Sequence, residues 1–323
     1  MHTNTHPDTN TGTGMNTGTG TGTGTGMNTG TGTGTGTGMN TGTGTDSDTA
    51  VDPATAPGYV HGYSRHEARR LGDQADTLAA LLHTGTAYPA GSRVLEMGCG
   101  VGAQTVHLLA SSPGAHLVAA DVSADSLDRA RARVAAQAPG ARVEWCRADV
   151  FDLPFAEGSF DHVFVCFVLE HLRDPGLALA GLRRVLRPGG TITVIEGDHG
   201  SAFFHPAGAY ADAAIANQVR LQSAAGGNAL VGRQLQPLLA GAGYGDIVVG
   251  PRTVYADRTR PALVEGFTRD TFIAMIESVR DDALAAGLTT PADWDRGMAE
   301  LRRTAEDGGT FHYTFFKAVA VRG

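Results

Sequence analysis

Short apolar runs alternate with amphipathic segments along the middle of the chain. The runs are bounded by glycines, acids and turn residues, so we predict that they form buried strands. They occupy residues 94–97, 117–121, 143–150, 160–171 with the exit from the strand, and 186–195 with the turn before it. Helical spacing marks residues 103–110, 123–138 and 174–186, with Ser123 as a predicted N-cap. Strands that alternate with helices predict a doubly wound parallel sheet.

The segments on either side of this alternation predict more helices and two more strands. The predicted helices are residues 57–82, 207–225, 230–242, 261–287 and 291–306. The predicted strands are residues 247–249 and 310–321. The second half of the chain is therefore less regular than the first.

An acid and three glycines follow the first predicted strand: Glu96, then Gly98, Gly100 and Gly102. Glycines here permit positive φ and let a ligand approach the backbone. A glycine triplet alone is a weak signal, because dinucleotide-binding folds use a similar one. The G-x-G-x-G spacing and the preceding carboxylate favour a cationic ligand with an amino group. S-adenosylmethionine fits this description.

Acids also end the next two predicted strands. Asp121 is placed to accept both ribose hydroxyls of such a ligand. Asp149 is placed to take the adenine amino group, although an acid there can also cap the following turn. This ordered set resembles the class I S-adenosylmethionine-dependent methyltransferases over residues 59–323. The resemblance implies a methyl-transferring enzyme with a Rossmann-like, seven-stranded doubly wound α/β sheet, its last strand antiparallel, plus helical cap insertions.

The composition and the resemblance together divide the chain. Residues 1–50 are mainly Thr-Gly repeats that cannot bury apolar surface, so we expect a disordered and dispensable tail. We expect residues 51–90 to form an N-terminal helical lid and residues 91–200 the cofactor-binding core. Residues 201–323 are expected to supply the acceptor-pocket helices and C-terminal strands of the same domain.

Several residues around the glycine turn are further predicted cofactor contacts. Tyr59 and Tyr63 precede the core, where an aromatic residue closes over the cofactor in related enzymes; simple packing is the alternative. Gln104 and Thr105 open the next helix, where they reach the methionine carboxylate or only start the helix. Cys99, Val122, Val150 and Phe167 complete the predicted set.

Glu170 and His171 leave the fourth predicted strand at its carboxyl end, beside the expected position of the methyl group. Either residue is a candidate general base. Glu170 is favoured because a pocket carboxylate without a basic neighbour is costly to keep for another reason. The alternatives are a hydrogen-bonding role for Glu170 and packing against the cofactor for His171.

Aromatic and polar residues after the fifth predicted strand are candidates for binding the acceptor. We expect Asp198 and His199 to lie just past that strand. Aromatic faces there would stabilise a positive charge, although core packing is the commoner role. Polar groups would hold a phosphate, although surface positions are the default for arginine. The predicted substrate-binding set is Phe203, Phe204, Tyr210, Asn228 and Arg233.

The entry segment, residues 59–74, is similar to small-molecule methyltransferases of actinomycete natural-product pathways. Within these, the position of Glu170 resembles the prenyl C-methyltransferases that act on geranyl diphosphate. That resemblance implies an alkene attacking the methyl group, a carbocation held by aromatic rings, and Glu170 as its base. A free diphosphate would imply Mg²⁺ with Asn228 or Arg233. No metal site is predicted with certainty.

Two other classes of function stay open. One is an O-methyltransferase acting on a hydroxyl or carboxyl of a secondary metabolite or peptide, with His171 or Glu170 as base. The other is a non-catalytic cofactor-binding subunit. A small-molecule acceptor is the expected partner in both enzymatic readings, and a homo-oligomer is left open.

Charge, hydropathy and cysteine usage exclude several classes. A net charge of −8 without basic runs argues against a nucleic-acid partner. The longest apolar run, residues 163–169, is too short to span a bilayer. The three cysteines, Cys99, Cys146 and Cys166, fall in predicted strands or the glycine turn, so we expect reduced thiols and a cytoplasmic protein.

Overall fold

The computed structural model describes the backbone of residues 65–323 and the side chains of residues 74–323. The expectations for the Thr-Gly tail and for Tyr59 and Tyr63 lie outside the described residues. In the described part, the three cysteines form no disulfide. No helix in this part is long and apolar enough to cross a membrane.

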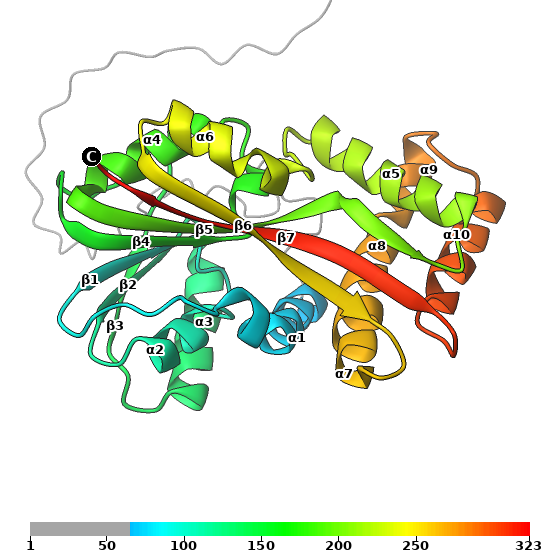
Figure 1. The fold of residues 1–323 in the computed structure, drawn as a ribbon, viewed down its shortest axis with the longest axis horizontal. Coiled ribbons are helices and arrows are strands. Elements are labelled where there is room, and N and C mark those ends of the chain that lie inside the picture. The colour runs from blue at the N-terminus through cyan, green and yellow to red at the C-terminus, as the bar shows by residue number, and fades with distance from the viewer. Residues whose placement is uncertain (1–64) are drawn as a thin grey trace, which may run out of the picture. The chain divides into compact units, whose positions relative to one another are not determined.

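A seven-stranded sheet in the order β3-β2-β1-β4-β5-β7-β6 organises the fold (Figure 1). Its first five strands in the chain pair in parallel, whereas β7 runs antiparallel to both β5 and β6. The predicted fold class is thus confirmed, including the reversed last strand. The strands are β1 (Arg93–Met97), β2 (His116–Asp121), β3 (Val143–Arg147), β4 (Phe160–Cys166), β5 (Leu186–His205), β6 (Gly245–Ala256) and β7 (Thr310–Val321).

Helices cover both faces of this sheet. Figure 1 shows α4 and α6 on one face and α1, α2 and α3 on the other, while α5 and α7–α10 gather around the far half of β5, β6 and β7. The α-helices are α1 (Arg65–Leu82), α2 (Thr105–Ser111), α3 (Ala124–Gln137), α4 (Pro175–Val185), α5 (Ala209–Ala224), α6 (Leu235–Gly241), α7 (Pro261–Leu263), α8 (Ala274–Ser278), α9 (Arg280–Ala285) and α10 (Pro291–Arg303). The 3₁₀-helices are η2 (Leu169–His171) and η3 (Val231–Gln234), and the π-helix is η4 (Val264–Ile273).

The helix starts follow local capping chemistry. Ser123 accepts a hydrogen bond from the Ser126 N–H at 3.2 Å, as predicted for the start of α3. Asp174 accepts from the Leu177 N–H at 2.8 Å, with Pro175 in the first turn of α4. These helices begin where side chains satisfy the amides that no helical carbonyl reaches.

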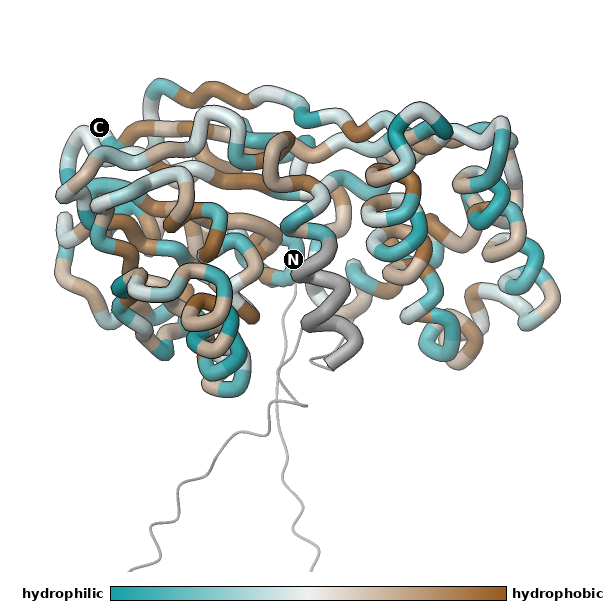
Figure 2. The backbone as a smooth tube through the Cα atoms, turned by 90° about the horizontal axis from the view of Figure 1, so that it is seen from below, coloured by the Kyte–Doolittle hydropathy of each residue, from teal (hydrophilic) through white to brown (hydrophobic). Residues whose placement is uncertain are grey.

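Two hydrophobic cores lie on opposite faces of the sheet, and β4 supplies both. Val163 and Val165 belong to the core beneath α4 and α6, whereas Phe164 and Cys166 belong to the core that contains α1 and η4. Successive strand side chains point to opposite faces, so a continuous apolar run is what a strand buried on both faces requires. Figure 2 shows hydrophobic residues concentrated along the strands.

Strand β5 corrects one prediction. It continues to His205, so Asp198 and His199 lie within the strand rather than after it. The reason is β7, which pairs with β5 from Thr191 to His205 across a register shift between Asp198 and Phe203. Strand β6 is longer than residues 247–249 for the same reason, because β7 pairs with it from Gly245 to Ala256.

The predicted helix over residues 261–287 is also corrected, because it is four consecutive elements rather than one. Its centre, η4, is a π-helix. There the Thr271 hydroxyl donates to the Gly266 carbonyl five residues earlier, at 2.7 Å. Wide turns of this kind are uncommon and occur often at functional sites. Segment η4 contributes Phe267 and Phe272 to the core beside the last strand.

Candidate functional site

The glycine turn links the end of β1 to α2. The N–H groups of Gly98 and Cys99 donate to the Ala120 carbonyl at 2.8 and 3.0 Å, which ties the turn to the end of β2. Gly98, Gly100 and Gly102 all have positive φ, at 76°, 52° and 75°. This is the backbone conformation that only glycine adopts without strain.

The three glycines serve different purposes. A side chain at Gly98 would collide with Val168, and one at Gly102 would meet the Ala130 backbone at 3.0 Å. Among the residues that the structure describes, a side chain at Gly100 would meet nothing within 4 Å. The first and third glycines therefore let parts of the protein approach each other. Gly100 alone keeps open space over the turn, where a ligand would lie.

Asp121 is the last residue of β2 and is hydrogen-bonded to the glycine turn. Its carboxylate accepts hydrogen bonds from the Gly100 and Ser123 N–H groups, both at 2.9 Å. Burial raises the pKa of this carboxyl, while those backbone donors act to lower it. Each carboxylate oxygen retains acceptor capacity for a ligand hydroxyl, so the predicted ribose contact is compatible with this geometry.

Asp149 follows β3 and accepts from the Phe151 N–H at 2.9 Å. The turn-capping alternative is thus present in the structure, although the residue remains exposed. The adenine contact stays a prediction. Val122 beside Asp121 is also exposed, whereas Cys99 and Val150 are buried.

Glu96 lies in β1, just before the glycine turn, and is buried. The Thr105 hydroxyl donates to it at 2.7 Å, which commits that side chain to the acid. Gln104 meets His83 at 2.7 Å and makes no side-chain cap to α2. Burial raises the pKa of Glu96 to about 8, and a nearby cationic ligand would oppose that rise.

The raised pKa of Glu96 predicts a pH-dependent stability. The folded state holds this proton more tightly than the unfolded chain, so the stabilisation is complete below about 4.5 and is lost as pH rises through about 8. Glu96→Gln removes the titration. We expect the variant's melting temperature, measured without cofactor, to fall less between pH 5 and 9 than that of the native protein, by about 3 °C or more.

Exposed Glu144→Gln is the control for this measurement, because its carboxyl lies at the surface beside Arg93. Some pH dependence of the melting temperature should remain in Glu96→Gln, because burial also raises the pKa of Glu196. Parallel melting curves for the native protein and Glu96→Gln would contradict a buried, protonated Glu96.

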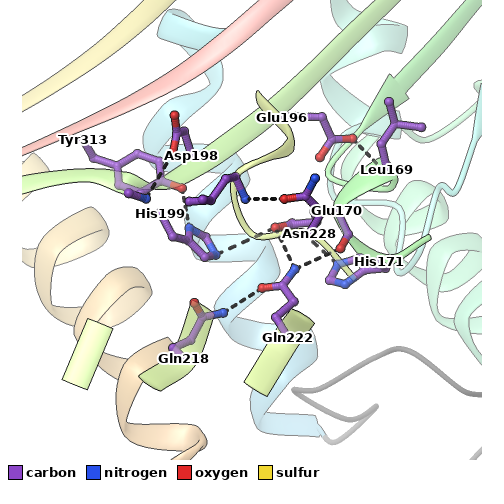
Figure 3. Close-up of polar contacts among 12 residues, drawn as sticks. Leu169, Glu170, His171, Glu196, Asp198, His199, Gln218, Gln222, Asn228 and Tyr313 are labelled. Carbon is purple, nitrogen blue, oxygen red and sulfur yellow. Dashed lines mark hydrogen bonds and ion pairs between the residues drawn. The ribbon is translucent and has the colours of Figure 1, made fainter. Parts of the chain in front are cut away.

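Glu170 lies in η2, directly after β4, with its side chain 12% exposed. Its carboxylate is 3.6 Å from His171 Nε2 and 3.8 Å from His199 Nε2 (Figure 3). Gln222 Nε2 donates toward it at 3.4 Å and to the Glu170 carbonyl at 3.1 Å. The structure thus places two imidazoles beside Glu170, which corrects the premise that this carboxylate has no basic neighbour.

The sequence did not lead us to expect a second carboxylate beside Glu170. Glu196 in β5 is buried and accepts from the Val168 and Leu169 N–H groups at 3.0 and 2.7 Å. Its other oxygen, Oε2, has no hydrogen-bond partner within the described part of the chain. Burial and the neighbouring Glu170 raise its pKa well above the ordinary value, which favours the protonated form of Glu196. An acid directly after the apolar run 192–195 was the available signal.

The aromatic residues of the site differ from those predicted. Phe203 is 62% exposed and stacks on His312, while exposed Tyr210 contacts Arg296. Neither ring lies in the aromatic core, so their contact with an acceptor stays a prediction. Past the register shift in β5, Phe203 faces solvent rather than the core. Phe204 points the other way and packs against Phe311.

A different aromatic cluster lies beside His199. Phe272 meets the His199 ring edge to face at 6.4 Å between centroids, and Phe315 lies 5.5 Å from Phe167. Phe167 itself has a positive φ of 59°, which is rare for an aromatic residue and places strain at the exit of β4. The cluster comes from η4 and β7, and its members are Phe267, Phe272, Phe311, Tyr313 and Phe315.

The predicted phosphate-binding residues have internal partners. Arg233 donates to both oxygens of Asp198, at 2.6 and 2.7 Å. Asn228 donates to Gln234 at 3.1 Å and accepts from the Leu230 N–H at 3.0 Å. Within the described part of the chain, no group of three His, Cys, Asp or Glu side chains is placed to hold a metal ion. Asn228 and Arg233 are thus engaged within the protein, and their contact with a Mg²⁺-diphosphate group stays a prediction.

Comparisons with known proteins show similarity to methyltransferases. Residues 95–194 match a family model described as a methyltransferase domain. The chain is 44% identical over 107 residues to a demethylmenaquinone methyltransferase of Clavibacter sepedonicus, covering 33% of this chain and 42% of that protein. It is 32% identical over 106 residues to the O-methyltransferase rstn1 of Aspergillus nomiae, covering 33% and 47%. The chain thus spans less than half the length of these curated relatives.

The fold also resembles a solved structure. The YcgJ protein of Bacillus subtilis aligns with a TM-score of 0.50 and 15% identity, over 76% of this chain and 98% of that one. This likeness concerns the fold alone. The family model ends at residue 194, so the residues around His199, the aromatic cluster and α5 lie outside it.

Proposed function

We propose that this chain, which contains a class I S-adenosylmethionine-dependent methyltransferase domain, methylates a small molecule that loses a proton to Glu170. One observation in particular supports this cofactor: among the described residues, Gly100 leaves open space over a turn whose amide donates to Asp121. When bound, S-adenosylmethionine supplies an electrophilic methyl group. The remaining chemistry belongs to the protein's own side chains.

The observation that carries the proposal is the position of Glu170. It is mostly buried at the carboxyl end of β4, with two imidazoles within 4 Å and an aromatic cluster beside one of them. Positioned carboxylates contribute about 10²–10⁴-fold as general bases. A hydroxyl beside Glu170 would give up its proton as the oxygen, or a conjugated ring carbon, takes the methyl group.

We favour a phenol or quinol as the acceptor. A deprotonated ring oxygen shares its charge with ring carbons, so one proton acceptor serves O-methylation and C-methylation alike. The names of the two curated relatives cover a demethylmenaquinone methyltransferase and an O-methyltransferase. Flat aromatic side chains such as Phe272 and Phe315 suit a flat ring.

A prenyl alkene is the second candidate, and the aromatic cluster is the observation that favours it. Ring faces attract a carbocation by roughly 0.5–2 kcal/mol each. Glu170 would then remove a proton from the cation rather than from a hydroxyl. A free diphosphate on the acceptor is disfavoured, because Arg233 is already paired with Asp198.

A transfer assay with labelled S-adenosylmethionine tests the proposal. The acceptor panel contains 1,4-dihydroxynaphthalene, catechol, geraniol, geranyl diphosphate and a short peptide. We expect methylation of a hydroxylated ring and none of its dimethoxy analogue, which has no proton to lose. Methylation of geraniol or geranyl diphosphate at carbon would support the second candidate instead. Cofactor binding without transfer to any acceptor would argue against both.

A further inference from the structure

A line of three polar side chains leads from the last strand to Glu170. The Tyr313 hydroxyl is 2.6 Å from His199 Nδ1, and His199 Nε2 is 3.8 Å from the Glu170 carboxylate (Figure 3). Tyr313 and His199 are both buried. The residues come from β7, β5 and η2, so only the folded chain brings them together.

The backbone makes room for this line. A side chain at Gly197 would occupy the place of the Tyr313 hydroxyl. The His199 N–H donates to the Ala229 carbonyl at 2.9 Å, which fixes the strand at that position. The Phe272 ring packs edge to face against the His199 ring. His199 is therefore held in one orientation, with a different ring nitrogen toward each neighbour.

The hydrogen bond to Tyr313 is tied to the tautomer of His199. The Tyr313 hydroxyl donates to His199 Nδ1 only when that nitrogen carries no proton. Burial and the carboxylates of Glu170 and Asp198 raise the pKa of Tyr313 well above its ordinary value, so the phenol keeps its proton. Neutral His199 then carries its own proton on Nε2, the nitrogen that faces Glu170.

We propose that His199, oriented by Tyr313, is a positioning residue that keeps Glu170 ionised by directing its Nε2–H at the carboxylate. The proposal rests on the function proposed above and adds two residues to it. A protonated Glu170 cannot accept a proton, and burial of a carboxylate disfavours its ionised form. A donor aimed at the carboxylate opposes that effect.

Several charged or titratable groups face Glu170 from the elements around it. The negative charge of Glu170 raises the pKa of Cys166 and of Glu196, so these two groups and Glu170 do not all ionise together. Asp198 carries a charge of the same sign as Glu170 but is neutralised by Arg233. The groups are His171 from η2, Cys166 from β4, Glu196, Asp198 and His199 from β5, and Tyr313 from β7. The imidazoles of His171 and His199 are the donors in this set.

Nitrogen-15 NMR of the histidine rings tests the tautomer without any acceptor. In the cofactor-bound protein we expect neutral His199 to be protonated at Nε2 and bare at Nδ1, and Tyr313→Phe to yield a mixture of both forms. Tyr244→Phe is the matched control, because Tyr244 is buried and donates to the Leu179 carbonyl elsewhere. A proton on Nδ1 in the native protein would overturn the proposal.

The pH profile of methyl transfer to 1,4-dihydroxynaphthalene tests the consequence. Without the donor the pKa of Glu170 rises, so the acid limb of kcat should move up by about one pH unit in His199→Leu, a roughly tenfold loss below it. His199→Gln should restore most of the limb, because its amide also donates. An equal loss at every pH would show a purely structural role and overturn the inference. If this acceptor is not methylated, the proposed acceptor class fails and the NMR result still decides the tautomer.

Discussion

Replacing Glu170 with glutamine is expected to lower methyl transfer by about 10²–10⁴-fold while S-adenosylmethionine affinity stays the same. Glutamine keeps the size of the side chain and can still receive the Gln222 and His199 contacts, but its amide cannot take a proton. Turnover is measured with the best acceptor of the panel, and affinity by calorimetry. Glu144→Gln, at the exposed surface, is the control.

The products and one further variant separate the mechanisms. For a prenyl acceptor, a cation that keeps its proton is open to capture by water, and the methylated alcohol would be detected by mass spectrometry. If His171 were the base, His171→Ala would be impaired and Glu170→Gln tolerated. Near-native turnover of Glu170→Gln on every acceptor would refute a proton-accepting role for this residue.

Replacing Gly100 with valine is expected to weaken S-adenosylmethionine binding by about 10²-fold or more, which corresponds to about 2.8 kcal/mol. The new side chain would occupy the open space over the turn and would strain a residue at φ 52°. Calorimetric titration with S-adenosylmethionine and with S-adenosylhomocysteine measures the loss. The overall fold should survive, because no atom in the described part of the chain lies within 4 Å of the added Cβ.

Gly140→Val is the matched control for this prediction. Gly140 also has positive φ, at 88°, and its added Cβ would also meet nothing within 4 Å. It follows α3 and lies before β3, at the opposite end of the strands from the glycine turn. The two variants should therefore lose similar stability, whereas only the Gly100 variant should lose cofactor affinity. Equal affinities would place the cofactor elsewhere.

The cofactor half of the site was predictable because its signals are contiguous. Glu96 and the three glycines stand within seven residues, and Asp121 ends the neighbouring strand. The carboxyl ends of neighbouring parallel strands meet at one edge of a sheet, so an acid at each strand end locates the site without tertiary information. Even here, only the structure separates Gly100, with open space above it, from Gly98 and Gly102, which pack against Val168 and Ala130.

The acceptor half was much less predictable. Phe203 lies near the end of β5 and Tyr210 in the first turn of α5, yet both face outward. The rings beside His199 come from segments some 70–115 residues farther along the chain. Arg233 was a plausible phosphate ligand until its pairing with Asp198 was visible. Such contacts depend on how β7 inserts between β5 and β6, and no local pattern encodes that register.

The sequence by itself determined the sheet of alternating strands and helices, the glycine turn, and the acids that hold it, because each depends on residues close together in the chain. Tertiary structure alone decided which groups surround Glu170. Two histidines, a second carboxylate and a tyrosine converge there from η2, β5 and β7. Their protonation depends on burial and on each other's charge, and both exist only once these distant strands have paired.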